Sequence, residues 1–272
     1  MERAVDYIRL KTNILNHCVE DRLKYDPDIV ELHLELPDLL EEAALRRTIV
    51  RLQEQGVKVY LHQPPKLEGT FWDLMTGDAA FYDQYMDVSR RLARICREER
   101  VRSVIHAHYA YSPEQPLHRI TATNSQELRR RIEHVTEFAG DAFLWEDTIH
   151  GLFSYENPYL IDEVVKPLNL PLNVDVSHAF IALGGDNDKL RGVLQATRPY
   201  AQYYHLVDSM GVAHDSLPLG QGRIDWRMVA PLVADRDFIF EISLPDDHSD
   251  CTRMIESAAY FRGVLAEAGQ IR

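Results

Sequence analysis

Short apolar runs alternate with longer amphipathic segments along most of the chain. Eight runs have the length of a β-strand, at residues 7–12, 29–34, 57–61, 101–105, 142–145, 172–176, 203–207 and 238–240. Segments of helical length follow many of them, most clearly at 38–55, 79–99, 125–138, 188–199 and 250–268. Gly56 and Gly140 end two of these segments, as glycine commonly does at the end of a helix. This alternation predicts a parallel sheet, because parallel strands need a long crossover connection.

Eight strand–helix units favour one closed barrel over an open sheet. The 272 residues match a (β/α)8 TIM barrel, which has roughly 250 residues. A doubly wound open sheet is the alternative, but its nucleotide fingerprint is missing. No GxGxxG follows the first strand, and the lone Gly220-Gln221-Gly222 follows the seventh. We therefore expect a single (β/α)8 barrel domain over residues 1–272, with its site at the C-terminal ends of the strands.

Groups that bind metals or move protons end six of the predicted strands. They are His62, His106, Glu146, Asp175, His205 and Glu241. A seventh group, His178, lies about one helical turn beyond Asp175. The C-terminal strand ends of a barrel share one face, so these side chains are expected to converge on one pocket. Each residue taken alone also fits a turn or a helix cap, but the repetition over six strands favours a common site.

Two of these groups indicate a cation. Glu146 follows the apolar run AFLW, and Glu241 follows FIF. An unpaired carboxylate in the barrel mouth would be unfavourable to bury, and a cation that pairs with both removes that penalty. Imidazoles mixed with carboxylates suit zinc, manganese or cobalt better than calcium. The strand ends therefore predict a transition-metal site.

The composition narrows the classes of partner. A net charge of −13 repels polyanions at long range, which argues against non-specific binding to nucleic acid. No apolar run approaches the roughly 20 residues that span a membrane, and the N-terminal segment is charged from its second residue. Three scattered cysteines support neither a disulfide framework nor a CxxC metal site. We expect a cytoplasmic protein that lies outside the membrane, and we leave a homo-oligomer open.

The strand-end motifs resemble those of the xylose isomerase-like TIM barrels. The segments that carry the resemblance lie between residues 28 and 245 and read LHQPP, VIHAH, LWEDT, NVDVSHAF, YYHLVDSMG, LPLGQGRIDW and FEIS. That family includes sugar and sugar phosphate isomerases and epimerases, and it is related to the endonuclease IV-type apurinic nucleases. The resemblance implies the same barrel and a metal-dependent activity.

In the sugar-epimerase branch, the resemblance places one divalent ion (Mn²⁺ or Zn²⁺, or else Co²⁺) on Glu146, Asp175, His205 and Glu241. Glu146 and Glu241 then also form the acid/base pair, and His178 contacts the substrate. His62 and His106 become further substrate contacts, or they hold a second ion with Glu146. An ion chelated by a sugar's carbonyl and adjacent hydroxyl acidifies the neighbouring C–H and stabilises the enediolate. One carboxylate removes the proton and the other returns it.

The nuclease branch, by the same resemblance, uses three zinc ions. Its first two sites correspond to His62, His106 and Glu146, and to the four epimerase ligands given above. Its third site combines the histidine of the DxxH motif, here His178, with a later Asp-x-His. That segment reads HDS in this chain, so His214 replaces the aspartate and Ser216 replaces the histidine. This departure argues against the third zinc and against three-metal phosphodiester chemistry.

Two loops add candidate substrate contacts. Residues 220–222 (GQG) and Arg223 either lie near a substrate oxyanion or phosphate, or Arg223 is simply a surface charge. The rings of Phe71, Trp72 and Tyr109 either form an apolar wall against a sugar face or pack within the fold. Both pairs of alternatives stay open at this point.

The sequence as a whole favours a metal-dependent sugar or sugar phosphate isomerase or epimerase that acts on a small carbohydrate-like substrate. The alternative is a metal-dependent phosphodiesterase or apurinic endonuclease-like hydrolase with a two-metal site. A related lyase or dehydratase, or a barrel that binds a metabolite without turning it over, completes the set.

The acidic composition generates a test of the partner class. We expect no measurable affinity for duplex DNA at physiological salt, where non-specific binders typically reach roughly 10⁻⁴–10⁻⁶ M. Fluorescence anisotropy with a labelled duplex, repeated at a lower salt concentration, measures this affinity. Salt-dependent binding in that range, or cleavage of a duplex that contains an abasic site, would promote the nuclease function over the isomerase.

Overall fold

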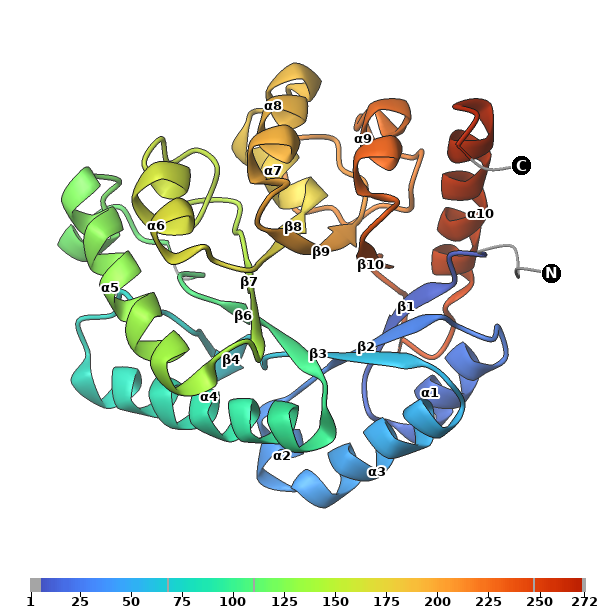
Figure 1. Cartoon of the computed structure of the whole chain (residues 1–272), viewed down its shortest axis with the longest axis horizontal. Coiled ribbons are helices and arrows are strands. Elements are labelled where there is room, and N and C mark those ends of the chain that lie inside the picture. The colour runs from blue at the N-terminus through green and yellow to red at the C-terminus, as the bar shows by residue number, and fades with distance from the viewer. Residues whose placement is uncertain (1–5, 68, 110, 247, 271–272) are drawn as a thin grey trace.

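The computed structural model describes residues 6–67, 69–109, 111–246 and 248–270. In this part of the chain, eight parallel strands close into a barrel surrounded by helices (Figure 1). The barrel strands are β1 (Arg9–Thr12), β2 (Ile29–His33), β3 (Lys58–His62), β6 (Arg102–His106), β7 (Phe143–Glu146), β8 (Leu172–Asp175), β9 (Ala201–Leu206) and β10 (Asp237–Phe240). They are neighbours in chain order, and β10 returns to β1 through the pair Leu10 and Phe240. The expected (β/α)8 fold is confirmed, and the open sheet is wrong.

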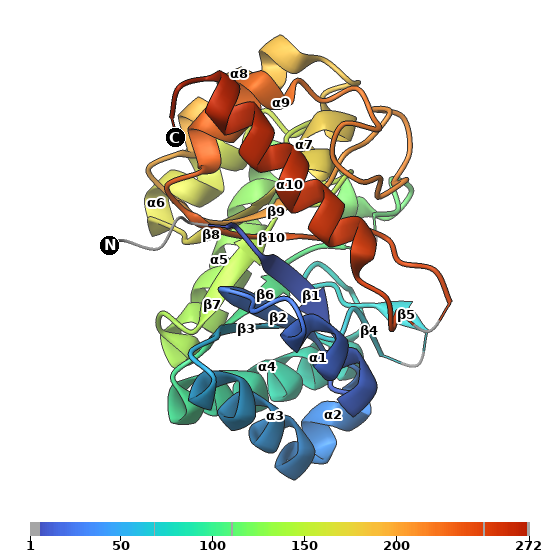
Figure 2. The same ribbon diagram turned by 90° about the vertical axis from the view of Figure 1, so that its right-hand side faces the viewer.

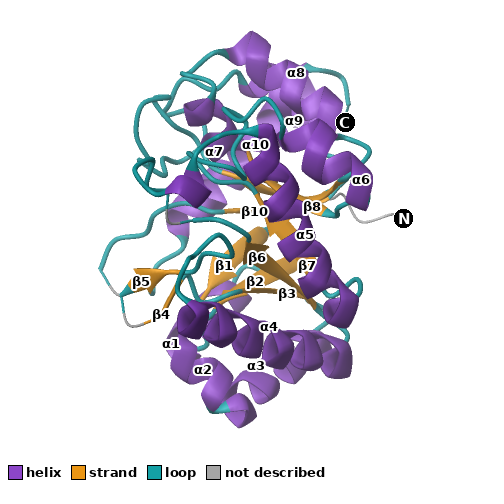
Figure 3. Cartoon of the chain, turned by 90° about the vertical axis from the view of Figure 1, so that its left-hand side faces the viewer, coloured by secondary structure: helices purple, strands orange, loops and turns teal. Residues whose placement is uncertain are grey.

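Helices cover the outside of the barrel (Figure 3). They are α1 (Asn16–Leu23), α2 (Leu36–Leu40), α3 (Glu42–Glu54), α4 (Ala79–Glu99), α5 (Ala122–Ala139), α6 (Lys166–Leu168), α7 (Val176–Ala182), α8 (Asn187–Thr197), α9 (Trp226–Val233) and α10 (Thr252–Glu267), with a 3₁₀ turn η1 (Pro116–His118) and a π-helix η2 (Leu160–Val165). Side chains of Asp78, Thr121 and Asp186 cap α4, α5 and α8 by accepting backbone N–H groups. Among the described residues, no helix is both long enough and apolar enough to cross a membrane.

The single helix expected at residues 38–55 is wrong, because α2 and α3 are separated at Glu41 (φ −102°, ψ 54°). Leu39 and Leu45 are both fully buried. On one continuous helix, side chains six positions apart would point about 120° away from each other. The break at Glu41 resets the helical phase, so both leucines face the core. Pro37, in the first turn of α2, fits the start of a separate helix.

A short hairpin follows β3 and was not predicted from the sequence. Its strands β4 (Lys66–Leu67) and β5 (Thr70–Phe71) pair antiparallel. Figures 2 and 3 place the hairpin on the same side of the barrel as the long loops after β9 and β10. Strands of two residues carry no periodic pattern, which is why the apolar pattern left this segment as a loop.

An apolar layer inside the barrel supports the polar residues at its mouth. Its members are Ile29, Tyr60, Val104, Leu144, Tyr203 and Ile239, all buried. Each stands two positions before a polar residue of the same chain segment, in turn Glu31, His62, His106, Glu146, His205 and Glu241. Residues i and i+2 of a strand face the same side, so a strand that turns the apolar residue inward also turns the polar one inward. The six apolar side chains, which we call the floor, therefore fill the barrel directly beneath its polar mouth.

From this arrangement we predict that the floor contributes to the free energy of unfolding. Leu144→Ala removes a fully buried side chain from the floor, beneath Glu146, and should lower the free energy of unfolding by about 2–5 kcal/mol. Leu40→Ala, at a side chain that is 59% exposed on α2, is the matched control. It should change the free energy of unfolding by less than about 0.5 kcal/mol. Urea unfolding followed by circular dichroism compares the two variants. Equal changes in the free energy of unfolding would mean that the floor contributes no more to stability than an exposed side chain does.

Candidate functional site

Four strand-end side chains converge at the C-terminal mouth of the barrel. Glu146 ends β7, Asp175 ends β8, His205 lies in β9, and Glu241 directly follows β10. One ligand atom from each lies within 4.8 Å of those from the others. His205 Nδ1 is 2.7 Å from Glu146 Oε1, 2.9 Å from Glu241 Oε2 and 3.9 Å from Asp175 Oδ2. We call these four residues the central cluster.

The central cluster is short of positive charge. His205 Nδ1, Glu146 Oε1 and Asp175 Oδ2 are buried, and none of them has an aligned hydrogen-bond partner among the described residues. Burial raises the pKa of Asp175, and the carboxylates of Glu241 and Glu146 raise it further. A single cation among these atoms would pair with all of them. One imidazole and three carboxylates are a donor set that suits a divalent transition metal.

Glu31, inside β2, fixes the proton of the central histidine. Its carboxylate is fully buried, and Oε2 accepts a hydrogen bond of 3.0 Å from His205 Nε2. A proton held on Nε2 leaves the Nδ1 lone pair free for a cation. Burial raises the pKa of Glu31, but His205 and His33 together outweigh it and lower the pKa to about 2, so the carboxylate is charged. The sequence analysis missed Glu31, although it is the one carboxylate inside the run IVELHL.

A second group shares Glu146 with the central cluster. His62 Nε2 and His106 Nε2 lie 3.2 Å and 3.1 Å from Glu146 Oε2. His62 Nδ1 donates to the carbonyl of Gln63 at 2.8 Å, so its Nε2 turns either a second proton or a lone pair toward the carboxylate. Burial lowers the pKa of His106 to about 3, which keeps that ring neutral. The two oxygens of Glu146 thus face two different sets of nitrogen atoms.

His178 and His214 meet at the edge of the cavity. The backbone N–H of His178 donates to Asp175 Oδ1 (2.8 Å), and its Nδ1 donates to the carbonyl of Asp147 (2.9 Å). Its Nε2 lies 3.3 Å from His214 Nε2. His214 therefore takes the place at which the nuclease pattern has a carboxylate. Ser216 offers a hydroxyl where that pattern has a second imidazole.

The loop after β9 is built around the buried carboxylate of Asp208. It accepts hydrogen bonds from the backbone N–H of Gly220 (2.8 Å) and from the indole N–H of Trp226 (2.9 Å). A Cβ at Gly222 would lie 2.2 Å from Asp208 Oδ1, so only glycine fits there. The GQG segment therefore has a structural role. Arg223 is exposed and does not line the barrel-mouth cavity, so its contact with substrate stays a prediction.

A cavity of about 260 Å³ opens above the central cluster. It is lined by Glu146 and Glu241, by histidines including His178, and by the rings of Phe71 and Tyr109. The centroids of these two rings are 4.5 Å apart, so together they form an apolar wall of the cavity, and their contact with a sugar stays a prediction. Trp72 is 1% exposed and packs in the core instead.

A buried aspartate holds this wall in place. Asp73 Oδ1 accepts a hydrogen bond from His108 Nδ1 (2.7 Å), and Oδ2 lies 2.8 Å from His118 Nε2. The same three residues are close enough to hold a metal. However, His118 Nδ1 accepts a hydrogen bond from the backbone N–H of Ser112 (3.1 Å), which leaves the imidazole proton on Nε2. We therefore interpret Asp73, His108 and His118 as a hydrogen-bonded link between the segment that carries Phe71 and the segment that carries Tyr109. We call these three residues the Asp73 latch.

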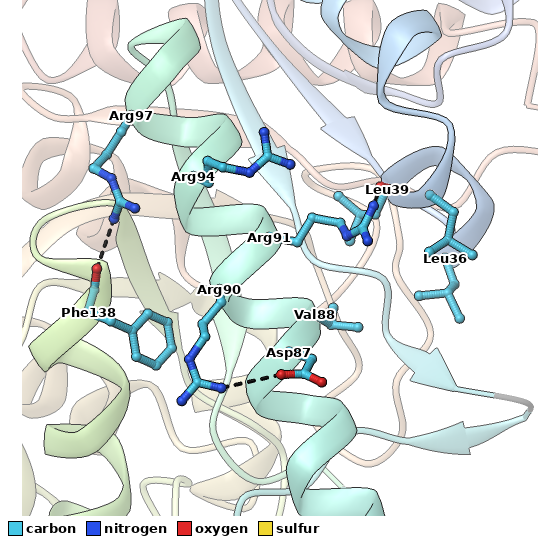
Figure 4. Close-up of a pocket in the computed structure, with 10 residues that line it drawn as sticks. Leu36, Leu39, Asp87, Val88, Arg90, Arg91, Arg94, Arg97 and Phe138 are labelled. Atoms are coloured by element: carbon cyan, nitrogen blue, oxygen red, sulfur yellow. Dashed lines mark hydrogen bonds and ion pairs between the residues drawn. The ribbon is translucent and has the colours of Figure 1, made fainter.

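A wider hollow of about 680 Å³ lies outside the barrel, between α2, α4 and the end of α5 (Figure 4). Arginines of α4 line it, but they are already partnered. Arg90 donates to Asp87 (3.3 Å), and Arg97 donates to the carbonyl of Phe138 (2.8 Å), as the dashed lines in Figure 4 mark. None of the groups among the described residues that could hold a metal ion lies there.

Comparisons with known proteins agree with the fold. A family model described as the xylose isomerase-like TIM barrel matches residues 24–263. A D-tagatose 3-epimerase-like protein of known structure is 15% identical, with a TM-score of 0.77 over 96% of this chain and 98% of that chain. D-psicose 3-epimerase from Clostridium cellulolyticum H10, solved with D-tagatose, is 14% identical, with a TM-score of 0.64 over 97% and 96%.

A third structure, the IOLI protein with a bound zinc atom, is 17% identical, with a TM-score of 0.65 over 96% of both chains. No curated protein matches this chain. At identities this low, the three structures show a shared fold.

The central cluster predicts a resident metal ion. We expect the purified protein, after reconstitution, to hold about one equivalent of a transition-metal ion there. Glu31→Gln nearly preserves the side-chain shape but removes the charge that orients His205, and it should weaken Zn²⁺ affinity about 10- to 100-fold. Titration of metal-free protein with ZnCl₂ against a competing chelator measures both quantities.

Glu133→Gln, at an exposed position of α5, is the matched control and should bind Zn²⁺ as the unmodified protein does. Protein that holds no manganese, cobalt, zinc or iron after reconstitution would contradict the metal centre. Equal affinity of the Glu31→Gln variant and the unmodified protein would contradict only the role given to Glu31.

Proposed function

The chain belongs to the xylose isomerase-like TIM barrel family, and from this premise we propose that it is a metal-dependent sugar or sugar phosphate isomerase or epimerase. The observation that carries the proposal is the pair of carboxylates at the central cluster. Glu146 and Glu241 approach His205 Nδ1 to 2.7 Å and 2.9 Å from two different strands. Both also line the cavity, so each is within reach of a bound substrate.

Glu146 and Glu241 act as the acid/base pair in this proposal. A divalent ion held by the central cluster supplies Lewis-acid chemistry, which makes the C–H next to a carbonyl more acidic. One carboxylate removes that proton and the other returns a proton, to the same carbon in an epimerase or to the adjacent carbon in an isomerase. His178 contacts the substrate at the cavity edge. The wall of Phe71 and Tyr109 excludes water from one side.

The number and type of the proposed metal ions follow from the same residues. We assign one divalent ion, Mn²⁺ or Zn²⁺ or else Co²⁺, to the central cluster, and the donor types support this assignment. A second ion at His62, His106 and Glu146 is supported by the two imidazole nitrogens that face one carboxylate oxygen. Without that ion, His62 and His106 serve as substrate contacts. The zinc atom of the IOLI structure and the D-tagatose of the D-psicose 3-epimerase structure are in keeping with a metal and a small carbohydrate.

A metal-dependent phosphodiesterase is the second candidate, favoured by the Glu146 carboxylate that faces two ligand groups. Two metals about 3.5–4 Å apart, bridged in this way, are typical of phosphoryl-transfer enzymes. The replacement of the third nuclease site by His214 and Ser216 argues against it. The net charge of −13 also argues against a polyanionic substrate. A cytoplasmic location and a homo-oligomer stay predictions.

The acid/base pair is tested by two isosteric substitutions. Glu146→Gln or Glu241→Gln should lower turnover by at least about 10²–10⁴-fold, the usual contribution of general acid–base catalysis, because each removes a proton carrier and a metal ligand. The unmodified enzyme, loaded with metal and incubated in D₂O with a panel of ketoses, aldoses and their phosphates, should place deuterium on a carbon next to the carbonyl. Proton NMR reads this exchange.

The Glu133→Gln variant should exchange deuterium at the unmodified rate, and circular dichroism should show all three variants folded. Exchange by Glu241→Gln at the unmodified rate would make that carboxylate structural, and the two-carboxylate mechanism would have to be dropped. Exchange with no sugar of the panel, together with hydrolysis of a phosphodiester, would favour the second candidate.

A further inference from the structure

His33 ends β2 and lines the cavity, yet the proposed mechanism gives it no role. Its ring is stacked on that of His62, with centroids 4.4 Å apart and planes inclined by 19°. The side chain is 29% exposed, whereas that of His205 is fully buried. A molecule in the cavity can therefore touch His33. It cannot touch His205 except through the central cluster.

The charges of two carboxylates favour a proton on Nε2 of His33. Nε2 lies 2.8 Å from Glu31 Oε1 and 3.6 Å from Glu241 Oε1, which are ion-pair distances without the alignment of a hydrogen bond. Carboxylate oxygens at these distances bring only lone pairs, so the proton of the neutral imidazole belongs on Nε2, between the two. Nδ1 then carries a lone pair, and the contacts that described residues make with His33 reach its Nε2 and its ring face. The structure thus leaves one hydrogen-bond acceptor of His33 unused at the cavity.

A metal site at Glu31, His33 and His62 is the competing interpretation, because their ligand atoms lie within 4.8 Å of one another. The Nδ1 of His62 is engaged with the Gln63 carbonyl, and its Nε2 faces Glu146, where the second ion of the proposed function would lie, so His62 has no nitrogen left for a separate ion. The ammonium of Lys11 also lies 3.7 Å from Glu241 Oε1, where it would repel another cation. Two ligands beside an ammonium do not make a metal site.

We infer that His33 is a substrate-binding residue whose Nδ1 accepts a hydrogen bond from a substrate hydroxyl beside the carbon served by Glu241. This inference rests on the proposed function. An acceptor there selects a carbon that carries a hydroxyl, because a carbonyl or a deoxy carbon has no proton to donate. A site built to bond a hydroxyl rejects analogues that lack it. Glu31 is the positioning residue, since it holds the Nε2 proton and so keeps Nδ1 free.

Two substitutions separate the two nitrogens of His33. His33→Gln places an amide group near the position of Nε2, toward Glu31, and loses the polar atom at Nδ1. His33→Asn does the reverse. On a sugar that exchanges deuterium, His33→Gln should raise KM by about 3- to 10-fold, the range of one neutral hydrogen bond, with a smaller change in kcat. His33→Asn should raise KM less. His134→Gln, at an exposed position of α5, is the control and should leave both constants unchanged.

The proton position is read independently of activity by ¹⁵N NMR of the Zn²⁺-loaded protein. We expect the His33 proton on Nε2 and a shift of the Nδ1 signal when D-tagatose is added as a probe. A proton on Nδ1 overturns the inference. So does a KM of His33→Gln equal to that of the unmodified enzyme, which would leave the proposed function intact. Absence of deuterium exchange by the unmodified enzyme with every sugar overturns the proposed function, and this inference with it.

Discussion

The burial of like charges at the barrel mouth is the constraint on which the rest of the site depends. Four carboxylates surround one imidazole there, those of Glu31, Glu146, Asp175 and Glu241. Groups of like charge that are removed from water destabilise a fold unless cations offset them. His205 offsets part of this charge, and Lys11 adds an ammonium 3.7 Å from Glu241. The remaining negative charge favours a cation at the central cluster, which supports the proposed metal ion on structural grounds as well as catalytic ones.

The alternation of side chains along each strand decides where these charges lie. Every strand that brings a polar group to the mouth holds a side chain two positions earlier on the same face, and in six of them that side chain belongs to the apolar floor. The floor side chains are buried beneath the polar groups, and the rings of Tyr60 and Tyr203 stack within it with centroids 4.2 Å apart. Charges held above a buried apolar layer interact more strongly than they would in water. Strand register therefore sets both the position and the strength of the site.

The position of each polar residue relative to its apolar run also decides how much of the site could be predicted from the sequence. Glu146, Asp175 and His205 stand at the ends of apolar runs, so the pattern marked them. Glu31 stands inside such a run, where a single charge reads as an irregularity, and Lys11 belongs to the weakest of the eight runs. The fold followed from the regular alternation of strands and helices. The hairpin and the Asp73 latch did not, because both depend on contacts between segments that no local pattern records.

Glu31 also links two parts of the site that are otherwise separate. Its Oε2 accepts a hydrogen bond from His205 in the central cluster, and its Oε1 lies 2.8 Å from Nε2 of His33, which lines the cavity. Under the proposed function, a change in the charge of this one carboxylate should therefore alter metal affinity and substrate affinity together. His62 and His106 connect to the central cluster through Glu146 instead. His62 and His106 also line the cavity, so under the proposed function a change there acts on the substrate directly as well as through Glu146. The two halves of the mouth are thus coupled through different carboxylates, and a variant in one half need not resemble a variant in the other.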